Sequence, residues 1–197
     1  MLSSSLIGLC LLLQPQEQPS PAAPIQDETQ PTPRPEARTI GGTRITQPRK
    51  TKHVSPEWPA SALRAGLTGS VVVESVIGVD GHVQSMKVLS GYHALASAAT
   101  AAVRKWQYTP TELDGTAVPV IMTITVNFRL SSPPKRDDLI GMVHDADPEL
   151  RWAAVRWLGR FRPITAKQKK AVESALTDPS DLVRTAAKEA MARLETQ

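Results

Sequence analysis

The fold of this chain is decided by residues 118–130, which read VPVIMTITVNFRL. Apolar residues occupy every even position of this stretch, from Val118 to Leu130. Most of the odd positions hold Thr, Asn or Arg instead. Successive side chains of a strand point to opposite faces of the sheet, so this alternation is typical of a strand. The stretch therefore predicts a long β-strand with one face in a core.

Three further elements precede this strand. Pro59 and Gly66 flank an Ala-rich run, and a proline at the start with a glycine past the end predicts a short helix. Residues 70–79 are rich in β-branched residues, Asp80-Gly81 is a strong hairpin turn signal, and residues 83–89 are the predicted return strand. A second helix is predicted at 95–106, where apolar residues recur at helical spacing; they are Leu95, Ala98, Ala99, Ala102, Val103 and Trp106.

The order helix, hairpin, helix, strand predicts an α+β domain over residues 49–130. Two helices would cover one face of a three-stranded antiparallel sheet.

After the prolines at 133–134 the pattern becomes wholly helical, and it repeats with a spacing of 33 residues. The matching pairs include Leu150 with Val183, Phe161 with Leu194, Asp145 with Asp178 and Arg151 with Arg184. A fixed period of this length predicts stacked helical hairpins, here two of them over residues 136–197.

Residue patterns for catalysis or metal binding are missing from the sequence. The four histidines (His53, His82, His93 and His144) lie in separate predicted elements, and a lone cysteine, Cys10, cannot complete a zinc site. Asp80 and Asp114 each precede a glycine, so a turn explains them without chemistry. We therefore expect a protein that is not an enzyme and holds no cofactor and no metal.

The net charge of +4 and the pI of about 9.4 permit binding to anionic surfaces. The basic residues form only two short clusters, at 49–52 and at 167–170. A nucleic-acid interface needs a denser basic stripe or a recognised module. We therefore expect solvated basic clusters and no nucleic-acid partner.

The N-terminal residues predict export. Residues 2–13 are mainly apolar, and this run is shorter than the roughly 20 residues that span a bilayer. It has the length of a signal-peptide core, and Pro21-Ala22-Ala23 is a small-residue cleavage site, so residues 1–23 are interpreted as a signal peptide. Residues 24–48 are rich in Pro, Gln and Thr and predict a disordered tether. We expect a periplasmic protein, or one anchored in the inner membrane if the true start lies upstream.

Residues 52–130 resemble the TonB C-terminal domain family. The matching positions are Pro56, Trp58-Pro59, Ala62, Gly69, Val71, Val73, Asp80-Gly81, Val83, Val88, Gly91, Leu95, Ala98-Ala99, Val103, Trp106, Pro110, Asp114-Gly115, Val118-Pro119 and Phe128. The resemblance implies that the final strand lies at a sheet edge and pairs with a short peptide, the TonB box of an outer-membrane transporter. The partner-binding residues would be Val120, Ile121, Met122, Thr123, Ile124, Thr125 and Val126.

Residues 136–197 resemble HEAT-like repeats. The resemblance implies that Asp145, Arg151, Asp178 and Arg184 form a structural hydrogen-bonding ladder. Two repeats are fewer than the three or so that such arrays need for stability, so they should dock on the α+β domain or on a partner. Trp152 lies outside the core stripe and is either a contact residue or a packed one.

Two functions remain open on this basis. In the first, the protein binds a transporter peptide by strand addition and takes part in energy transduction. In the second, it is a periplasmic scaffold that assembles other envelope proteins on the HEAT-like repeats, while the TonB-like domain is only structural. The two differ in whether the 118–130 edge is free or is covered by the C-terminal helices or by another copy.

Overall fold

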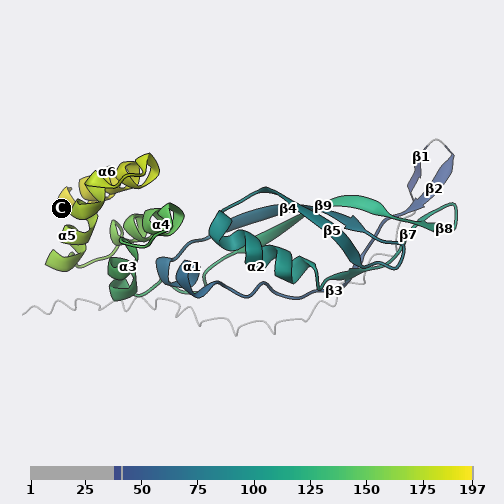
Figure 1. Ribbon diagram of the computed structural model, residues 1–197, viewed down its shortest axis with the longest axis horizontal. Coiled ribbons are helices and arrows are strands. Elements are labelled where there is room, and N and C mark those ends of the chain that lie inside the picture. Colours follow the sequence, from purple (N-terminus) through teal and green to yellow (C-terminus); the bar gives the residue numbers. More distant parts are fainter. Residues whose placement is uncertain (1–37, 41, 197) are drawn as a thin grey trace, which may run out of the picture. The chain divides into compact units, whose positions relative to one another are not determined.

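The computed structural model describes residues 38–40 and 42–196 (Figure 1). The strands are β1 (Arg38–Ile40), β2 (Thr43–Thr46), β3 (Lys50–Lys52), β4 (Gly69–Ile77), β5 (Val83–Ser90), β6 (Gln107–Tyr108), β7 (Thr111–Leu113), β8 (Thr116–Val118) and β9 (Val120–Phe128). The helices are α1 (Ala60–Ala65), α2 (His93–Val103), α3 (Arg136–Met142), α4 (Pro148–Leu158), α5 (Ala166–Ser174), the short 3₁₀ helix η1 (Ala175–Thr177) and α6 (Asp181–Glu195). The predicted α+β domain followed by an all-α pair of helical hairpins is confirmed.

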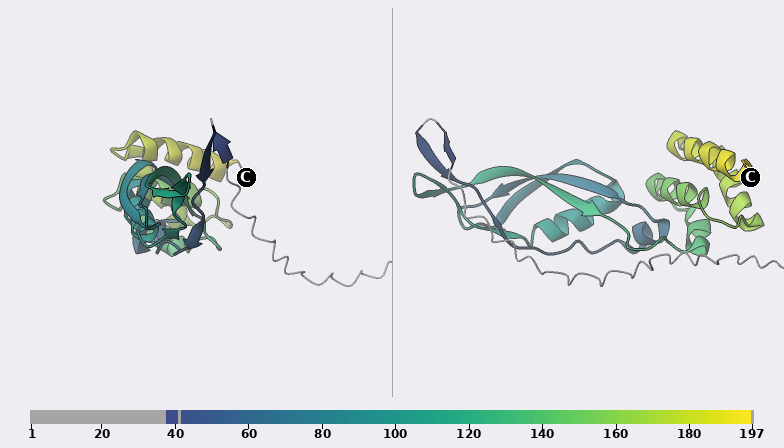
Figure 2. Two further views of the ribbon diagram at one scale, coloured as in Figure 1. Left: turned by 90° about the vertical axis from the view of Figure 1, so that its right-hand side faces the viewer. Right: turned by 180° about the vertical axis from the view of Figure 1, so that it is seen from behind.

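The principal sheet has the strand order β5-β4-β9, and both pairings are antiparallel. β4 and β9 pair over their whole length, from Gly69 opposite Phe128 to Ile77 opposite Val120. Helix α2 packs against β4 and β5 on one face of this sheet (Figure 1), and the view from behind shows the strands in front of it (Figure 2). The core between them is built from inward-facing apolar side chains: Val71, Val73, Ile77, Leu95, Ala99, Val103, Ile124, Val126 and Phe128.

Three sequence predictions need correction at their boundaries. The final strand is shorter than 118–130, because Pro119, which has no N–H to donate, separates β8 from β9. The second helix ends at Val103, and Trp106 lies beyond it, just before β6. Residues 38–40 and 43–46, assigned to the tether, form the paired strands β1 and β2, and β2 also pairs with β7. The predicted signal peptide and residues 24–37 of the tether lie outside the described residues.

Missed turn chemistry explains the third error. Thr39-Ile40 and Thr43, with Ile45, are β-branched and flank Gly41-Gly42, a pair of residues that favours a tight hairpin. The neighbouring prolines and polar residues obscured this short signal. The hairpin extends the second, smaller sheet, whose order is β1-β2-β7-β8.

The helical pair, α3 to α6, has its own apolar interior. Helices α4 and α6 pack together along the positions that repeat every 33 residues, and the buried members include Leu150, Ala154, Leu158, Val183 and Ala187. The N-terminus of α4 is closed by Asp147, whose carboxylate accepts a hydrogen bond of 2.8 Å from the N–H of Glu149. Such caps satisfy backbone donors that the helix itself leaves free.

The ladder residues connect the two hairpins. Arg151 donates two hydrogen bonds to Asp178, from Nε at 2.7 Å and from Nη2 at 2.9 Å. Its third nitrogen, Nη1, binds the carbonyl oxygens of Asp145 and Ala146. Arg184 makes the equivalent contacts one repeat later, to the carbonyl oxygens of Asp178 and Pro179. The two side chains of the Arg151–Asp178 pair are only 11% and 7% exposed, so this is a buried, bidentate ion pair.

The helical pair docks on the α+β domain through α4. The indole Nε1 of Trp157 donates to the carbonyl oxygen of Gly66 at 2.9 Å. Gly66 closes α1 with a φ of 67°, and a Cβ at this position would lie 2.5 Å from the same indole nitrogen. Glu149 accepts a hydrogen bond of 3.2 Å from the N–H of Ala94 in the first turn of α2. The sequence left open whether two repeats would dock on this domain or on a partner, and the structure shows the first.

The Arg151–Asp178 pair allows a matched stability test. Asp145 occupies the same place one repeat earlier, but its carboxylate accepts only the N–H of Asp147 among the described residues. We expect Asp178→Ala to lower the free energy of unfolding by about 3 kcal/mol, because it leaves a buried guanidinium unpaired. Asp145→Ala should cost about 1 kcal/mol, the contribution of one hydrogen bond. Denaturant unfolding of both variants measures the difference, and equal losses would contradict the assigned role of the pair.

The same pair sets an acid dependence. The hydrogen bonds from Arg151 hold the pKa of Asp178 below its ordinary value of 3.8. A carboxyl whose pKa is lowered by folding stabilises the protein above its unfolded pKa, and this contribution is lost as the pH falls through the folded pKa. The protein should therefore lose stability more steeply below about pH 4 than Asp178→Asn does. Unfolding midpoints measured across that range provide the comparison.

Candidate functional site

Strand β9 lies at the edge of the principal sheet. Its nine residues pair with β4 on one side, and no strand in the described part of the chain pairs with its other side. In an antiparallel strand, alternate residues direct their N–H and C=O groups to opposite neighbours. Every second residue of β9 therefore directs its backbone donor and acceptor away from β4. Such an edge must be blunted or used, since it offers a template for another strand.

The side chains of β9 do little to block this edge. Ile124 and Val126 face the core and are at most 5% exposed, so they present only backbone to a partner. Ile121, Thr123 and Thr125 face outward and are exposed, with Ile121 at 66%. No charged residue occurs within 120–128. All seven predicted partner-binding residues, 120–126, lie on this one uninterrupted strand.

A groove of about 490 Å³ borders the C-terminal part of β9. One wall is formed by Thr125, Val126, Asn127 and Arg129, and the other by the segment 50–58 together with Trp106. Two indoles fix this segment in place. The ring of Trp58 meets the ring of Phe128 edge-on at 5.3 Å between centroids, and Nε1 of Trp106 donates to the carbonyl oxygen of Val54 at 2.7 Å.

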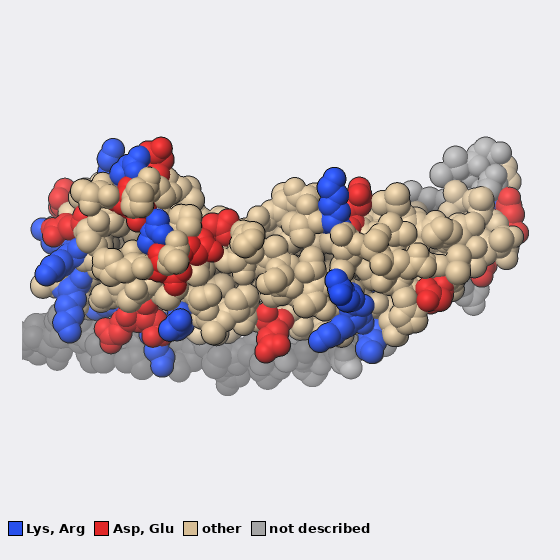
Figure 3. Space-filling view, viewed as in Figure 1, with Lys and Arg blue, Asp and Glu red and all other residues tan. Residues whose placement is uncertain are grey.

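The lining of this groove carries positive charge. Nζ of Lys50 lies 3.7 Å from the centroid of the Trp106 ring, and the imidazole of His53 lies 4.8 Å from the same ring. Arg129 is exposed at the other wall, and no Asp or Glu lines the groove. Lys and Arg side chains gather beside β3 on the face shown in Figure 3. A peptide on this edge would thus meet aromatic rings and cations beyond its backbone pairing.

Sequence reasoning missed this groove. Its residues come from three separated stretches, and only the pairing of β3 with β6 brings Lys50 close to Trp106. Trp58 and Trp106 were recognised as family positions, which was the available signal. Their role in positioning the 50–58 segment depends on contacts that no local pattern encodes.

The two Asp-Gly turns have structural roles. Asp80 accepts a hydrogen bond of 3.1 Å from the N–H of His82, and this bond lowers the pKa of its carboxyl. Asp114 accepts one of 2.8 Å from the N–H of Arg44 in the neighbouring strand β2.

Among the described residues, no three His, Cys, Asp or Glu side chains are grouped closely enough to bind a metal ion. A search of the same residues finds no helix with the length and apolarity needed to cross a membrane.

Comparison with known proteins supports this assignment of the parts. Residues 54–130 match the family model of the Gram-negative bacterial TonB protein C-terminal domain, and residues 120–196 match that of HEAT repeats. Protein TonB of Vibrio cholerae is 29% identical over 110 residues, which cover 54% of this chain and 45% of that protein. Protein TonB of Klebsiella pneumoniae is 28% identical over 127 residues, covering 60% and 50% respectively. The chain spans about half the length of these curated relatives.

Among solved structures, the solution structure of the Pseudomonas aeruginosa TonB C-terminal domain aligns with 43% of this chain and 88% of that chain. The sequence identity is 23% and the TM-score is 0.38. The two family models match the two parts of the chain that differ in secondary structure, the α+β part and the helical part. Residues 54–130 are therefore similar to the C-terminal domain of the TonB family, and residues 120–196 are similar to HEAT repeats.

Proposed function

We propose that this protein acts in TonB-type energy transduction for transport across the outer membrane, and that it does so from the periplasm. In this proposal it binds an extended peptide, the TonB box of a transporter or a similar segment of another envelope protein. The peptide adds as a fourth strand beside β9. The observation that carries the proposal is the outer edge of β9, which no described strand covers.

Backbone pairing suits this task. In strand addition, main-chain hydrogen bonds supply most of the affinity, and side-chain contacts add selectivity. β9 offers nine residues in a regular register with β4, so its edge is held in an extended conformation by the neighbouring strand. The helical pair makes its main contacts with α1 and α2, which supports a free β9 edge. A binding role also fits a protein for which we expect no catalysis.

Strand addition makes a prediction about the peptide itself. Only alternate residues of an added strand direct their N–H groups toward β9, while the others face solvent. N-methylation at every second position of a TonB-box peptide gives two series, one with odd and one with even positions methylated. One series should bind at least tenfold more weakly, and the other should bind nearly as well as the unmethylated peptide. Calorimetric titration of the full chain with both methylated series measures the effect. Equal effects in both series would contradict pairing through the backbone.

The location of the peptide can be tested on the protein. Thr123→Lys with Thr125→Lys places two charges on β9, where an added strand would have to desolvate them. We expect at least tenfold weaker peptide binding, which corresponds to about 1.4 kcal/mol. The matched control is Ser85→Lys on β5, the opposite edge of the same sheet. With the native Lys87, this variant also has two lysines on one edge strand, and it should bind the peptide normally. Loss of binding only in the β5 variant would place the peptide on the wrong edge for this proposal.

Peptide-induced changes confined to residues 136–196 would favour the scaffold function instead. In that case the peptide would leave β9 unchanged, and any partner would be held by the helical repeats. The two functions are thus separated by where binding perturbs the chain.

A further inference from the structure

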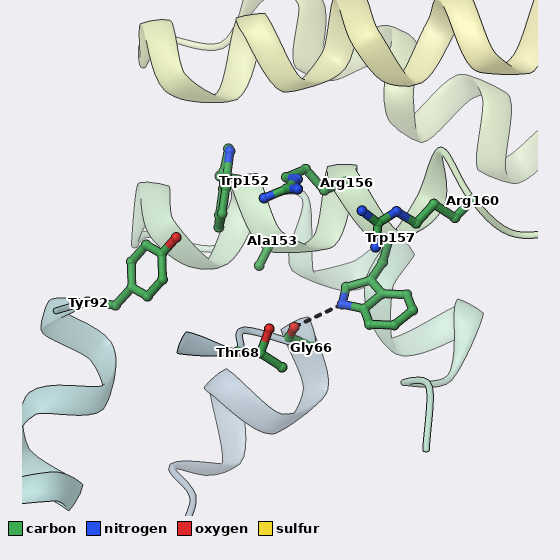
Figure 4. A pocket seen from close by; sticks show the side chains of 8 residues that line it. All are labelled: Gly66, Thr68, Tyr92, Trp152, Ala153, Arg156, Trp157 and Arg160. Carbon is green, nitrogen blue, oxygen red and sulfur yellow. Dashed lines mark hydrogen bonds between the residues drawn. The ribbon is translucent and has the colours of Figure 1, made fainter. Parts of the chain in front are cut away.

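A second surface lies where α4 meets the TonB-type domain. This surface contains a hollow of about 140 Å³. Its lining includes Arg156 and Arg160 on the α4 side and Thr68 and Tyr92 on the side of the TonB-type domain (Figure 4). Trp152 and Trp157 complete its lining. The volume suits a single charged group and is much smaller than the pockets that hold a cofactor or drug-sized ligand.

Both guanidinium groups are held in place and remain free to bind. Arg156 lies 4.6 Å from the ring centroid of Trp152, and Arg160 lies 5.7 Å from that of Trp157. Within residues 42–196, neither side chain has a hydrogen-bond acceptor or an ion-pair partner. Stacking on an indole leaves the N–H edge of a guanidinium available, and this edge matches a carboxylate or phosphate in two-point geometry.

The opposite wall adds hydroxyl donors and no negative charge. The hydroxyls of Thr68 and Tyr92 border the hollow, and partial burial raises the pKa of Tyr92, so its phenol stays protonated at neutral pH. Outside the lining, Glu149 accepts a hydrogen bond of 3.2 Å from the N–H of Ala94, and after burial its charge also raises the pKa of Tyr92. No Asp or Glu lines the hollow, so the positive charge of its arginines favours the binding of an anion.

An adjoining hollow of about 470 Å³ shares Trp152 and Arg156 and continues between α4 and α6. It exposes Leu182, whose side chain is 47% accessible. Its two acids have their own partners, because Asp181 pairs with Arg184 and Glu189 pairs with Arg193. The combined surface therefore has a cationic, aromatic end and an apolar end.

We propose that this surface binds an acidic segment of a protein partner, with one carboxylate between Arg156 and Arg160 and an apolar residue beside Leu182. Charge complementarity argues for the carboxylate, because two unpaired cations face a cavity without an acid. The composition argues for a protein, since Trp, Tyr and Arg are the residues enriched at interface hot spots. The surface is distinct from the β9 edge, so the protein would hold two partners, or two segments of one, at the same time.

The test uses two matched peptides, acetyl-Leu-Glu-Leu-amide and acetyl-Leu-Gln-Leu-amide, and inorganic phosphate as a third probe. Binding to the full chain is followed by NMR at the indole N–H of Trp152 and Trp157 and at the Nε–H of the arginines. We expect the glutamate peptide to bind at least tenfold more tightly than the glutamine peptide and to shift these signals. Arg156→Gln with Arg160→Gln should abolish the preference.

The control variant removes the same charge elsewhere, by Arg44→Gln with Arg104→Gln, and should keep the tenfold preference. Arg160 is exposed, so Arg160→Gln alone keeps the fold and should already weaken the glutamate peptide at least threefold. Equal binding of the two peptides would overturn the proposal, as would a preference that survives in the double variant. Phosphate binding without peptide binding would also overturn it, because the hollow would then be a site for small inorganic anions.

Discussion

The pairing of β4 with β9 is the interaction on which the rest of this structure depends. It joins the hairpin of β4 and β5 to the last strand of the TonB-type domain over nine residues, and it brings Val71, Val126 and Phe128 into one core. Because the sheet ends at β9, the same pairing that builds the core also creates the unpaired edge. The inward-facing side chains of β9 stabilise the core. The backbone N–H and C=O groups on the side of β9 away from β4 remain unpaired with any described strand.

The junction with the helical pair depends on a small number of polar contacts between apolar surfaces. Trp157 binds the carbonyl oxygen of Gly66, and Glu149 binds the N-terminus of α2. Trp152 packs against Tyr92 with 5.5 Å between the ring centroids. Because repeat arrays need about three units for stability, we expect this docking to act as the neighbour that a third repeat would supply. It also combines side chains from both parts in the hollow that contains Arg156 and Arg160.

The sequence alone predicted those features that follow from local periodicity. The alternation at 118–130 predicted the strand and its inward face, and Asp80-Gly81 predicted the hairpin that the structure contains. The 33-residue spacing predicted two helical hairpins. Predictions from local periodicity succeed because the backbone geometry of a strand, turn or helix fixes which side chains share a face.

Features that depend on distant contacts were not predicted. The β1–β2 hairpin is stabilised by β7, about 70 residues later, and its short strands lie among tether-like residues. The groove beside β9 needs Lys50 and Trp106 to meet through the β3–β6 pair. Trp152 was left between contact and packing, and its partner Tyr92 lies in the other part of the chain. In each case the missing information was which segments become neighbours.

The central claim, that the β9 edge accepts an added strand, is tested most directly by amide hydrogen exchange of the full chain with and without a TonB-box peptide. Without peptide, alternate amides of residues 120–127 should exchange rapidly, because they point away from β4. Saturation with peptide should protect those amides selectively and leave the amides already paired with β4 unchanged. Protection that appears only in the helical pair, or binding that leaves exchange along β9 unaltered, would contradict the account.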